Sequence, residues 1–397
     1  MAEAPWLTII GLGEDGPEGL PPASRAALRA AEVVLGPPRH LSLLPDLASE
    51  RIAWPVPFAD GLPILRALRG RRVVVLASGN PFWFGAGSVI ARDLAPGEWT
   101  AIPVPSSFSL AASRLGWPIE ATLCLGLHAA PLTRLRPHLA PGHRMILLMR
   151  DGAAVAEAAR YLTALGFGES RLWVLEALGG PRERVTSARA DDLRGEIAHP
   201  VALAVDVAGP GRVIPRCSGI EDDFFATDGQ ITRRPMRALA LSALAPRSGE
   251  TLWDIGGGSG SIGIEWCLAD RANRATSIEP RPDRAARIRA NADRLGVDLG
   301  VVEGRAPEAL DALPPPQAVF IGGGLSEALL ADLRDRLAPG TRLVAHAVTL
   351  ESEALLAAGS ARLGGELLRV SLSAATPLGG RRGWTAAYPV VQWRVVL

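Results

Sequence analysis

The stretch Leu252-Trp-Asp-Ile-Gly-Gly-Gly-Ser-Gly260 decides the fold of the second half of the chain. An apolar strand ends near the acidic Asp254, and side chains are then removed at alternate positions before a predicted helix. These alternate glycines are Gly256, Gly258 and Gly260. The next predicted strand ends in Glu279, where a carboxylate can hold the two hydroxyls of a ribose. Because glycines admit a ligand to the backbone and a helix N-terminus favours anions, the stretch predicts a nucleotide-type site.

A second glycine-rich turn, Ile9-Ile-Gly-Leu-Gly-Glu-Asp-Gly16, follows an apolar strand near the other end of the chain. The strand after this turn does not end in an acid, so the two sites are of different design. Both turns match the bare GxGxxG pattern, which is weak on its own. Two different nucleotide-type sites suggest a fused enzyme that performs a related reaction twice.

The composition excludes several classes of protein. The chain has 397 residues, a net charge of +1 and 42 basic residues, all of which are Arg, so a Schiff-base or general-base lysine is ruled out. Interspersed charges argue against a nucleic-acid partner, which needs a concentrated basic face. No apolar run is long enough for a membrane span. Guanidinium groups suit carboxylates and phosphates.

The cysteines and histidines give no sign of a metal site. Cys124, Cys217 and Cys267 are widely separated and form no CxxC pair, so we expect them to be buried and reduced, as in a cytoplasmic protein. The six histidines lack the spacing of metal ligands.

Strand-like and helix-like segments alternate along the chain, which predicts an α/β fold. The Gly- and Pro-rich residues 211–220 read as a linker between a domain at 1–210 and a domain at 221–397. The first domain is expected to divide into lobes of about 1–105 and 106–207, with a ligand cleft between them.

Strands are predicted in both halves, and the last two are expected to form a hairpin added to a parallel sheet. In the first half they lie near 7–10, 73–77, 101–104, 122–125, 145–149, 172–175 and 201–205. In the second half they lie near 251–253, 275–278, 299–302, 318–321, 342–345, 367–372 and 390–395. Residues 373–388 are expected to be a long polar loop.

The second half resembles class I methyltransferases that bind S-adenosylmethionine (AdoMet), and more specifically the decarboxylating precorrin methyltransferase domain. The motifs are Asp228-Gly-Gln-Ile-Thr-Arg-Arg234, the 252–260 turn, Glu303-Gly-Arg-Ala-Pro-Glu-Ala-Leu310, Phe320-Ile-Gly-Gly-Gly324 and Ala347-Val-Thr-Leu-Glu351. The resemblance implies a seven-stranded Rossmann-like fold. It also implies cofactor contacts at Asp254, Gly256, Gly258, Gly260, Glu279, Arg305, Ala306 and Gly322.

The same resemblance suggests substrate and catalytic residues. Gly323 and Gly324 would admit a bulky planar substrate, and Arg233 and Arg234 would bind its carboxylates. Thr232 and His346 are candidate proton donors. The alternatives are that Thr232 is the N-cap of a helix and that His346 is a hydrogen-bonded core residue.

The first half is similar to the class III tetrapyrrole methylases, which hold AdoMet in a cleft between two lobes. The resemblance rests on six segments of sequence: the first glycine turn, residues 31–36, Arg39-His-Leu41, Ala77-Ser-Gly-Asn-Pro-Phe-Trp-Phe-Gly85, residues 105–112 and Gly126-Leu-His128. The residues implied to bind the cofactor are Gly11, Gly79, Asn80, Pro81, Ser106, Ser107, Leu127 and His128.

Together the resemblances imply AdoMet-dependent methylation of precorrin-6Y at C5 and C15 with decarboxylation of the C12 acetate, giving precorrin-8 in cobalamin biosynthesis. We expect no metal, nucleic acid or membrane partner, and a homo-oligomer. The alternatives are an RNA methyltransferase, an oxidoreductase, or a non-catalytic protein that binds AdoMet or a tetrapyrrole.

Overall fold

The chain forms two compact structural units, and its last passage from the N-terminal to the C-terminal unit falls between Arg212 and Val213. The computed structural model describes residues 5–397. The N-terminal unit comprises Met1–Pro131 and Leu139–Arg212, and the C-terminal unit comprises Leu132–His138 and Val213–Leu397. Each unit has its own sheets and its own hydrophobic clusters, and each is described separately below.

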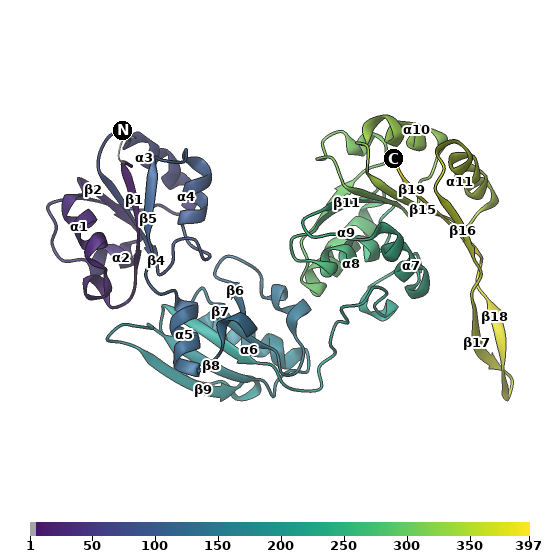
Figure 1. Ribbon diagram of the computed structural model, residues 1–397. Coiled ribbons are helices and arrows are strands. Elements are labelled where there is room, and N and C mark those ends of the chain that lie inside the picture. Colours follow the sequence, from purple (N-terminus) through teal and green to yellow (C-terminus); the bar gives the residue numbers. More distant parts are fainter. Residues whose placement is uncertain (1–4) are drawn as a thin grey trace. The chain divides into compact units, whose positions relative to one another are not determined.

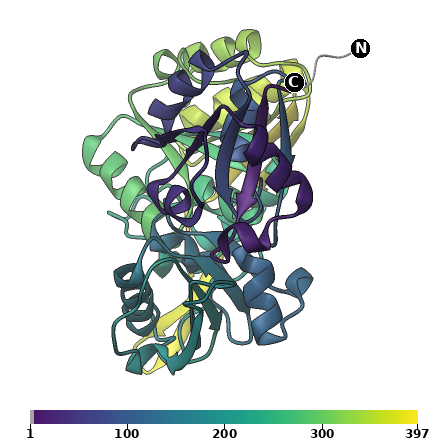
Figure 2. The same ribbon diagram turned by 90° about the vertical axis from the view of Figure 1, so that its left-hand side faces the viewer.

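The first lobe of the N-terminal unit is a parallel five-stranded sheet in the order β3-β2-β4-β1-β5. Its strands are β1 (Leu7–Leu12), β2 (Val33–Gly36), β3 (Glu50–Ala53), β4 (Val73–Ser78) and β5 (Trp99–Ile102). Alternate side chains leave opposite faces of this sheet. One face packs on α3 (Gly61–Ala67) and α4 (Gly87–Asp93), and the other on α1 (Pro22–Ala30) and α2 (Pro38–Leu43). Figure 2 faces this lobe and shows its strands between helices on both sides.

The second lobe contains a mixed five-stranded sheet in the order β6-β7-β10-β8-β9. The strands are β6 (Leu123–Gly126), β7 (Arg144–Leu148), β8 (Arg171–Glu176), β9 (Arg184–Arg189) and β10 (Val201–Asp206). Only β6 and β7 pair in parallel, and the remaining pairs are antiparallel. Helices α5 (Ser107–Leu115) and α6 (Gly152–Ala164) begin at N-caps whose side chains, Ser106 and Asp151, accept backbone hydrogen bonds.

The C-terminal unit is built on a seven-stranded sheet in the order β13-β12-β11-β14-β15-β19-β16. The strands are β11 (Thr251–Ile255), β12 (Arg274–Glu279), β13 (Leu299–Glu303), β14 (Ala318–Ile321), β15 (Arg342–Ala347), β16 (Glu366–Val370) and β19 (Val390–Val396). The first five are parallel, and β19 runs antiparallel to both β15 and β16. The predicted fold, a parallel sheet with an added terminal hairpin, is confirmed.

Helices cover both faces of this sheet (Figure 1). They are α7 (Arg234–Leu244), α8 (Ser261–Ala269), α9 (Pro282–Leu295), α10 (Glu327–Arg336) and α11 (Leu350–Leu363). The α7 and α8 side chains pack with Leu252 and Phe320, whereas α10 and α11 pack with Trp253 and Ile321 from the opposite face. Short 3-10 helices complete the structure at 16–19, 58–60, 119–121, 132–138, 190–192, 222–224 and 308–310.

The sequence analysis missed several strands, most of which lie at sheet edges or outside the main sheets. Residues 373–388, predicted as a loop, instead form β17 (Ser373–Leu378) and β18 (Arg381–Ala386), which pair only with each other. Their side chains are mostly exposed, so they lack the apolar alternation that marks a strand packed on a core. Strands β3 and β9 were missed for the same reason. Strand β2 lies inside its sheet and was missed because its four residues are all buried and show no alternation.

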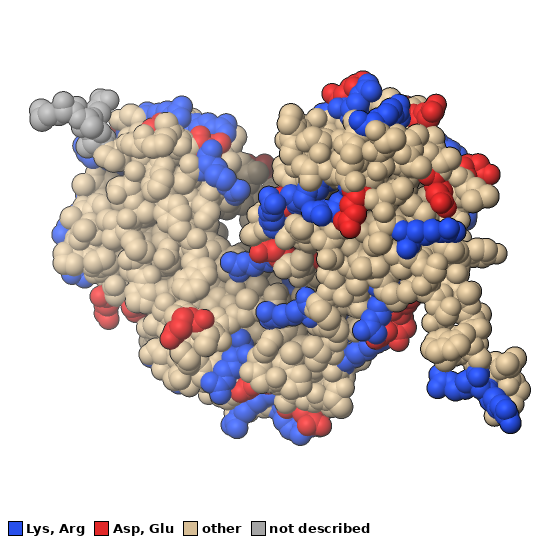
Figure 3. Space-filling view, turned by 45° about the vertical axis from the view of Figure 1, so that its right-hand side comes forward, with Lys and Arg blue, Asp and Glu red and all other residues tan. Residues whose placement is uncertain are grey.

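The surface carries acidic and basic side chains together. Figure 3 shows them interspersed over the face it presents, with basic side chains at the tip of the β17–β18 hairpin. Cys267 is buried and Cys124 half-buried, but Cys217 is exposed, so the prediction of burial is wrong for that residue. Among residues 5–397, none of the helices has the length and apolarity that crossing a membrane requires.

Candidate functional site

The glycine turn after β11 has the backbone that the alternate glycines predicted. Gly256, Gly258 and Gly260 have φ angles of +74°, +59° and +76°, a region that side chains with a Cβ rarely adopt. Because these glycines turn the chain directly into α8, the backbone amides of the turn lie at the carboxyl edge of the parallel sheet. This edge is where ligands of such sheets bind.

Glu279 lies beside this turn, at the end of β12. Its carboxylate accepts hydrogen bonds from Gly258 N, with the Oε2–N distance 2.9 Å, and from Arg281 N, with the Oε1–N distance 3.1 Å. The residue is 3% exposed. The acid that the sequence predicted for a ribose is therefore fixed against the predicted glycine turn, with its charge stabilised by backbone donors.

Asp254 lies in β11, just before the turn, and its side chain is buried. Its Oδ2 accepts hydrogen bonds from Ser277 Oγ at 2.9 Å and from Gly263 N at 3.3 Å. Burial raises the pKa of Asp254 to about 7, against the opposing effect of these hydrogen bonds. These contacts hold β11, β12 and α8 together behind the turn, and they engage one oxygen of the carboxylate that the sequence assigned to the cofactor.

The raised pKa of Asp254 predicts a pH-dependent stability. In the unfolded chain this carboxyl titrates near 3.8. The native state therefore binds more protons between about pH 4 and pH 7, and the free energy of unfolding falls as pH rises through that window. Relative to Asp254→Asn, we expect the wild-type C-terminal unit to lose about 1–3 kcal/mol of stability between about pH 5 and pH 8. Scanning calorimetry of both full-length proteins measures this difference, and a pH-independent difference would contradict it.

Two further turns reach the same edge of the sheet. Gly304 N donates to the backbone oxygen of Glu279 at 3.2 Å, and Gly322 N donates to the oxygen of Ile255 at 2.9 Å. The neighbouring Arg305 is exposed and Ala306 half-buried. A Cβ built on Gly256 would lie 2.7 Å from Gly323 Cα, so the two glycine turns touch through bare backbone, whereas Gly324 faces open space.

The candidate substrate and catalytic residues lie in other surroundings. Arg233 and Arg234 are exposed and pair with Asp222 and Glu221 respectively. The carbonyl of Thr232 accepts a hydrogen bond from the guanidinium of Arg237. The alternative of Thr232 as a helix N-cap is wrong, because the N-cap of α7 is Arg233.

His346 lies within β15 rather than after it. Its Nε2 is 2.9 Å from Gln392 Oε1, and its ring makes an edge contact with Phe320. Burial lowers the pKa of His346, so its imidazole is neutral at neutral pH.

In the N-terminal unit, residues of both lobes line a cavity of about 680 Å³. Five of the predicted cofactor residues line it: Gly79, Asn80, Ser106, Ser107 and His128. Its size lies within the usual range for small-molecule sites. The side chain of Ser106 accepts from Ser109 N as the cap of α5, and the side chain of Asn80 accepts from Phe82 N. Both side chains therefore shape the wall and leave backbone groups for a ligand.

The other predicted residues support the wall from behind. A Cβ on Gly11 would lie 1.9 Å from the oxygen of Gly79. Strand β1 and the turn after β4 can therefore approach each other this closely only because residue 11 has no side chain. The oxygen of Pro81 accepts from Gly87 N at 2.9 Å, and the amide of Leu127 donates to the oxygen of Leu148 at 2.9 Å.

The cavity wall also carries charged residues of two quoted motifs, Glu14 and Arg39, whose pairing was not predicted. Glu14, in the first glycine turn, pairs with both Arg39 and Arg182, and the Arg182 Nη2–Glu14 Oε2 distance is 3.2 Å. Arg39 also donates to Ser78 Oγ at 3.2 Å. Burial lowers the pKa of His40 to about 4, which keeps it neutral. Of the two guanidinium groups, that of Arg39 lines the cavity beside Glu14, where it can pair with a carboxylate of a ligand.

Aromatic rings form another part of the wall. The Trp83 and Phe108 rings lie 4.8 Å apart, and Phe84 adopts a φ of +56°. A bulky residue in this backbone region is rare and clusters at functional sites. The aromatic surface suits a flat, conjugated ligand. Within the described residues, no three His, Cys, Asp or Glu side chains converge as a metal site.

The sequence analysis also missed two polar residues near the glycine turn of the C-terminal unit. Asp228 pairs with Arg284 and Arg287 on α9, and Asn291 binds backbone groups of two segments. Asp228 belongs to the Asp-Gly-Gln motif, which was a usable signal. Asn291 lies in a helix with no distinguishing pattern, so the sequence offered no means of finding it.

Comparisons with known proteins agree with this two-part structure. Residues 6–194 match the family described as tetrapyrrole (corrin/porphyrin) methylases, and residues 223–397 match the family described as the precorrin methyltransferase domain. The crystal structure of the C-terminal domain of precorrin-6Y C5,15-methyltransferase from Rhodobacter capsulatus is 55% identical in sequence. The match covers 46% of the present chain and 100% of the chain in that crystal structure, with a TM-score of 0.45.

Two relatives match almost the whole chain. A precorrin-6Y C(5,15)-methyltransferase (decarboxylating) of Sinorhizobium sp is 50% identical over 396 residues, covering 98% of this chain and 96% of that protein. A protein of the same name from Mycobacterium tuberculosis is 40% identical over 399 residues, covering 98% of this chain and 99% of that protein. The chain therefore belongs to the family of decarboxylating precorrin-6Y C(5,15)-methyltransferases.

Proposed function

We propose that this chain uses AdoMet to methylate precorrin-6Y at C5 and C15 and removes the carboxyl group of the C12 acetate as CO2, giving precorrin-8. The observation that carries the proposal is the presence of two glycine-lined sites, built on separate sheets, in a chain that matches its relatives over nearly its full length. We assign C5 methylation to the N-terminal unit, and C15 methylation with decarboxylation to the C-terminal unit.

The residues of both sites fit AdoMet. In the C-terminal unit, Glu279 offers a carboxylate for ribose hydroxyls, and the Gly256–Gly260 turn offers bare backbone amides. In the N-terminal unit, the cavity offers the backbone of the 79–81 turn and an apolar, aromatic wall. When bound, AdoMet supplies an electrophilic methyl group on a sulfonium. The protein's part is then chiefly alignment, which can contribute about 7–11 kcal/mol.

In the N-terminal cavity, the charged residues of the wall would orient the substrate. Arg39, which lines the cavity, would hold a peripheral carboxylate of the macrocycle by exchanging part of its pairing with Glu14, while Glu14 keeps Arg182 as its second partner. The rings of Trp83 and Phe84 would hold the plane of the macrocycle. Together they fix which edge of the substrate faces the Gly79 turn.

In the C-terminal unit, the protein would position the acetate and return a proton after CO2 leaves. The electrons left by the departing carboxylate are accepted by the conjugated ring system, and the resulting carbon is protonated to a methyl group. Thr232 and His346 are the candidate proton donors. Because His346 is neutral, it can deliver a proton only as a relay. Arg233 and Arg234 would bind carboxylates, and Gly322, Gly323 and Gly324 would leave room for the macrocycle.

Replacing Glu279 by alanine tests the ribose assignment. We expect AdoMet binding at the C-terminal site to weaken by about 1–3 kcal/mol, roughly 5- to 150-fold, because hydroxyl and amide donors lose their acceptor. Glu303 is a matched control, since it ends the neighbouring strand in register with Glu279 but is exposed and paired with Arg289. Calorimetry on the full chain should show one weakened site for Glu279→Ala and none for Glu303→Ala. Unchanged affinity for Glu279→Ala would remove the ribose role.

The whole reaction is tested by incubating the purified full chain with AdoMet and precorrin-6Y. We expect a product whose mass shows two added methyl groups and the loss of one CO2. Unaltered substrate, with AdoMet bound in both sites, would instead favour a non-catalytic binding protein.

A further inference from the structure

A short segment before α7, residues 226–230, is attached to α9 by one buried side chain. Asn291 is 1% exposed, and its Nδ2 donates to the backbone oxygens of Ala226 and Ser259, each at 2.9 Å. Its Oδ1 accepts from Ala226 N at 2.9 Å. One amide therefore satisfies both backbone groups of Ala226 and a carbonyl of the glycine turn.

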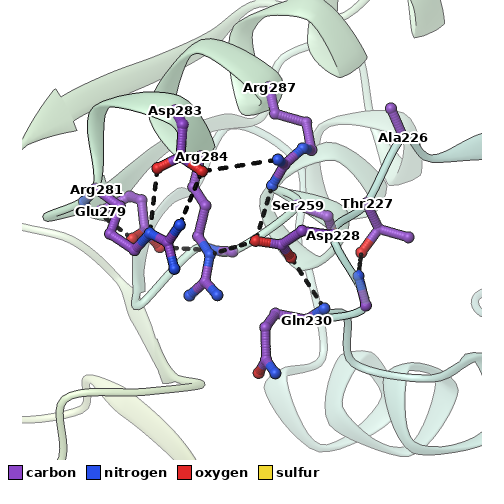
Figure 4. A network of polar contacts seen from close by, with 12 residues as sticks. Ala226, Thr227, Asp228, Gln230, Ser259, Glu279, Arg281, Asp283, Arg284 and Arg287 are labelled. Atoms are coloured by element: carbon purple, nitrogen blue, oxygen red, sulfur yellow. Dashed lines mark hydrogen bonds and ion pairs between the residues drawn. The ribbon is translucent and has the colours of Figure 1, made fainter.

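Two residues further on, the same segment is attached by charge. Asp228 Oδ2 accepts from Arg284 Nε at 2.9 Å and lies 3.2 Å from Arg287 Nη1, while its Oδ1 accepts from Gln230 N at 3.1 Å (Figure 4). The bond with Arg284 holds the pKa of Asp228 well below its usual range. The three charged side chains are each about a quarter exposed or less, so solvent screens the pairs only in part.

The attached segment reaches the candidate cofactor site. A Cβ built on Gly258 would lie 3.2 Å from the backbone oxygen of Gln230, so the segment packs directly on the glycine turn. Gly258 N donates to Glu279, and Glu279 also accepts from Arg281 N at the start of α9. A continuous set of contacts thus runs from Asp228 and its α9 partners to the carboxylate assigned to the ribose (Figure 4).

We infer that Asn291 and Asp228 are positioning residues that fix segment 226–230 on the glycine turn and so align Gly258 and Glu279 for the cofactor. The inference rests on the proposed function, in which AdoMet binds at this turn. Holding the turn in its binding geometry lowers the ordering cost of binding. The two residues therefore affect the affinity for AdoMet at the C-terminal site and leave the N-terminal site unchanged.

The test is AdoMet binding and single-turnover methylation by full-length variants. Asp228→Asn keeps an acceptor for Gln230 N but removes the ion pairs, so we expect the C-terminal dissociation constant to rise about three- to tenfold. For Asn291→Ala we expect a rise of about tenfold or more, because buried backbone groups lose their partners. Saturating AdoMet should restore the C15 methylation rate, and the N-terminal site and C5 methylation should stay at the wild-type level.

A double-mutant cycle separates positioning from general stability. Arg284→Gln removes the ion pair with Asp228 by changing its partner on α9. Combining it with Asp228→Asn should cause little additional loss of affinity for AdoMet. The control is Asp293→Asn, on the same helix, whose exposed side chain accepts from Thr133 Oγ1 outside this set of contacts; it should leave the dissociation constant unchanged.

Wild-type affinity in Asp228→Asn and in Arg284→Gln would overturn the inference. So would a loss of rate that saturating AdoMet does not restore. A wild-type protein that binds no AdoMet at its C-terminal unit would instead overturn the proposed function, which is a separate result.

Discussion

Replacing Gly256 by alanine is expected to abolish C15 methylation and the release of CO2 while C5 methylation continues. Gly256 has a φ of +74°, and a Cβ there would lie 2.6 Å from Gly323 N and 2.8 Å from Gly323 O. These are backbone atoms of the turn after β14, so no flexible side chain can move aside. The two turns must separate, and a displacement of about 1 Å at such a site costs about a hundredfold in rate.

A matched control distinguishes the clash from the cost of the backbone angle alone. Gly249 has a φ of +80°, but a Cβ added there would meet nothing within 4 Å. Gly249→Ala therefore bears the same conformational strain, about 1–2 kcal/mol, and should keep both methylations. Product masses and CO2 release from the two full-length variants provide the comparison. Gly256→Ala with normal CO2 release would show that contact between the two turns is not required.

Replacing Gly11 by alanine is expected to have the reciprocal effect, loss of C5 methylation. A Cβ on Gly11 would lie 1.9 Å from the oxygen of Gly79 and 2.8 Å from the amide of Val104. That oxygen accepts the hydrogen bond from Val104 N at 3.2 Å. The substitution therefore pushes the Gly79 turn, which lines the N-terminal cavity, away from β1 and Val104. We expect a loss of about a hundredfold or more in C5 methylation.

The C-terminal unit supplies the internal measure of folding for this variant. Gly11→Ala should still bind AdoMet at the C-terminal turn. Gly70→Ala should keep both reactions, because a Cβ at Gly70 would meet nothing within 4 Å despite a φ of +87°. A mixture of Gly11→Ala and Gly256→Ala chains is expected to form the doubly methylated, decarboxylated product, since each supplies the site that the other lacks. Retained C5 methylation in Gly11→Ala would contradict the placement of that reaction.

The features predicted most successfully from the sequence are those encoded locally. The glycine turn after β11 could be predicted because an apolar strand, alternate glycines and a helix follow one another within a few residues. Glu279 was placed correctly at a strand end for the same reason, and the structure adds its bond to Gly258. The parallel sheet with an added hairpin likewise follows from buried, regularly spaced apolar strands.

The remaining features depend on contacts between distant positions or on exposed strands. Glu14 and Arg182 meet across 168 residues of sequence, and Asn291 meets Ala226 across 65. No local pattern encodes such pairs. The β17–β18 hairpin buries too little surface to require alternation of apolar residues. Asp254 shows a further limit: its place near a strand end was predictable, but its hydrogen bonds with Ser277 of β12 and Gly263 of α8 were not, because no local pattern encodes them.

Counting the molecules of S-adenosylhomocysteine bound per chain tests the proposed division of labour most directly. Calorimetry or equilibrium dialysis of the full-length protein should give two per chain for the wild type and one for each of Gly11→Ala and Gly256→Ala. A single molecule per wild-type chain, or the loss of both from either variant, would contradict the presence of two independent methyl-donor sites.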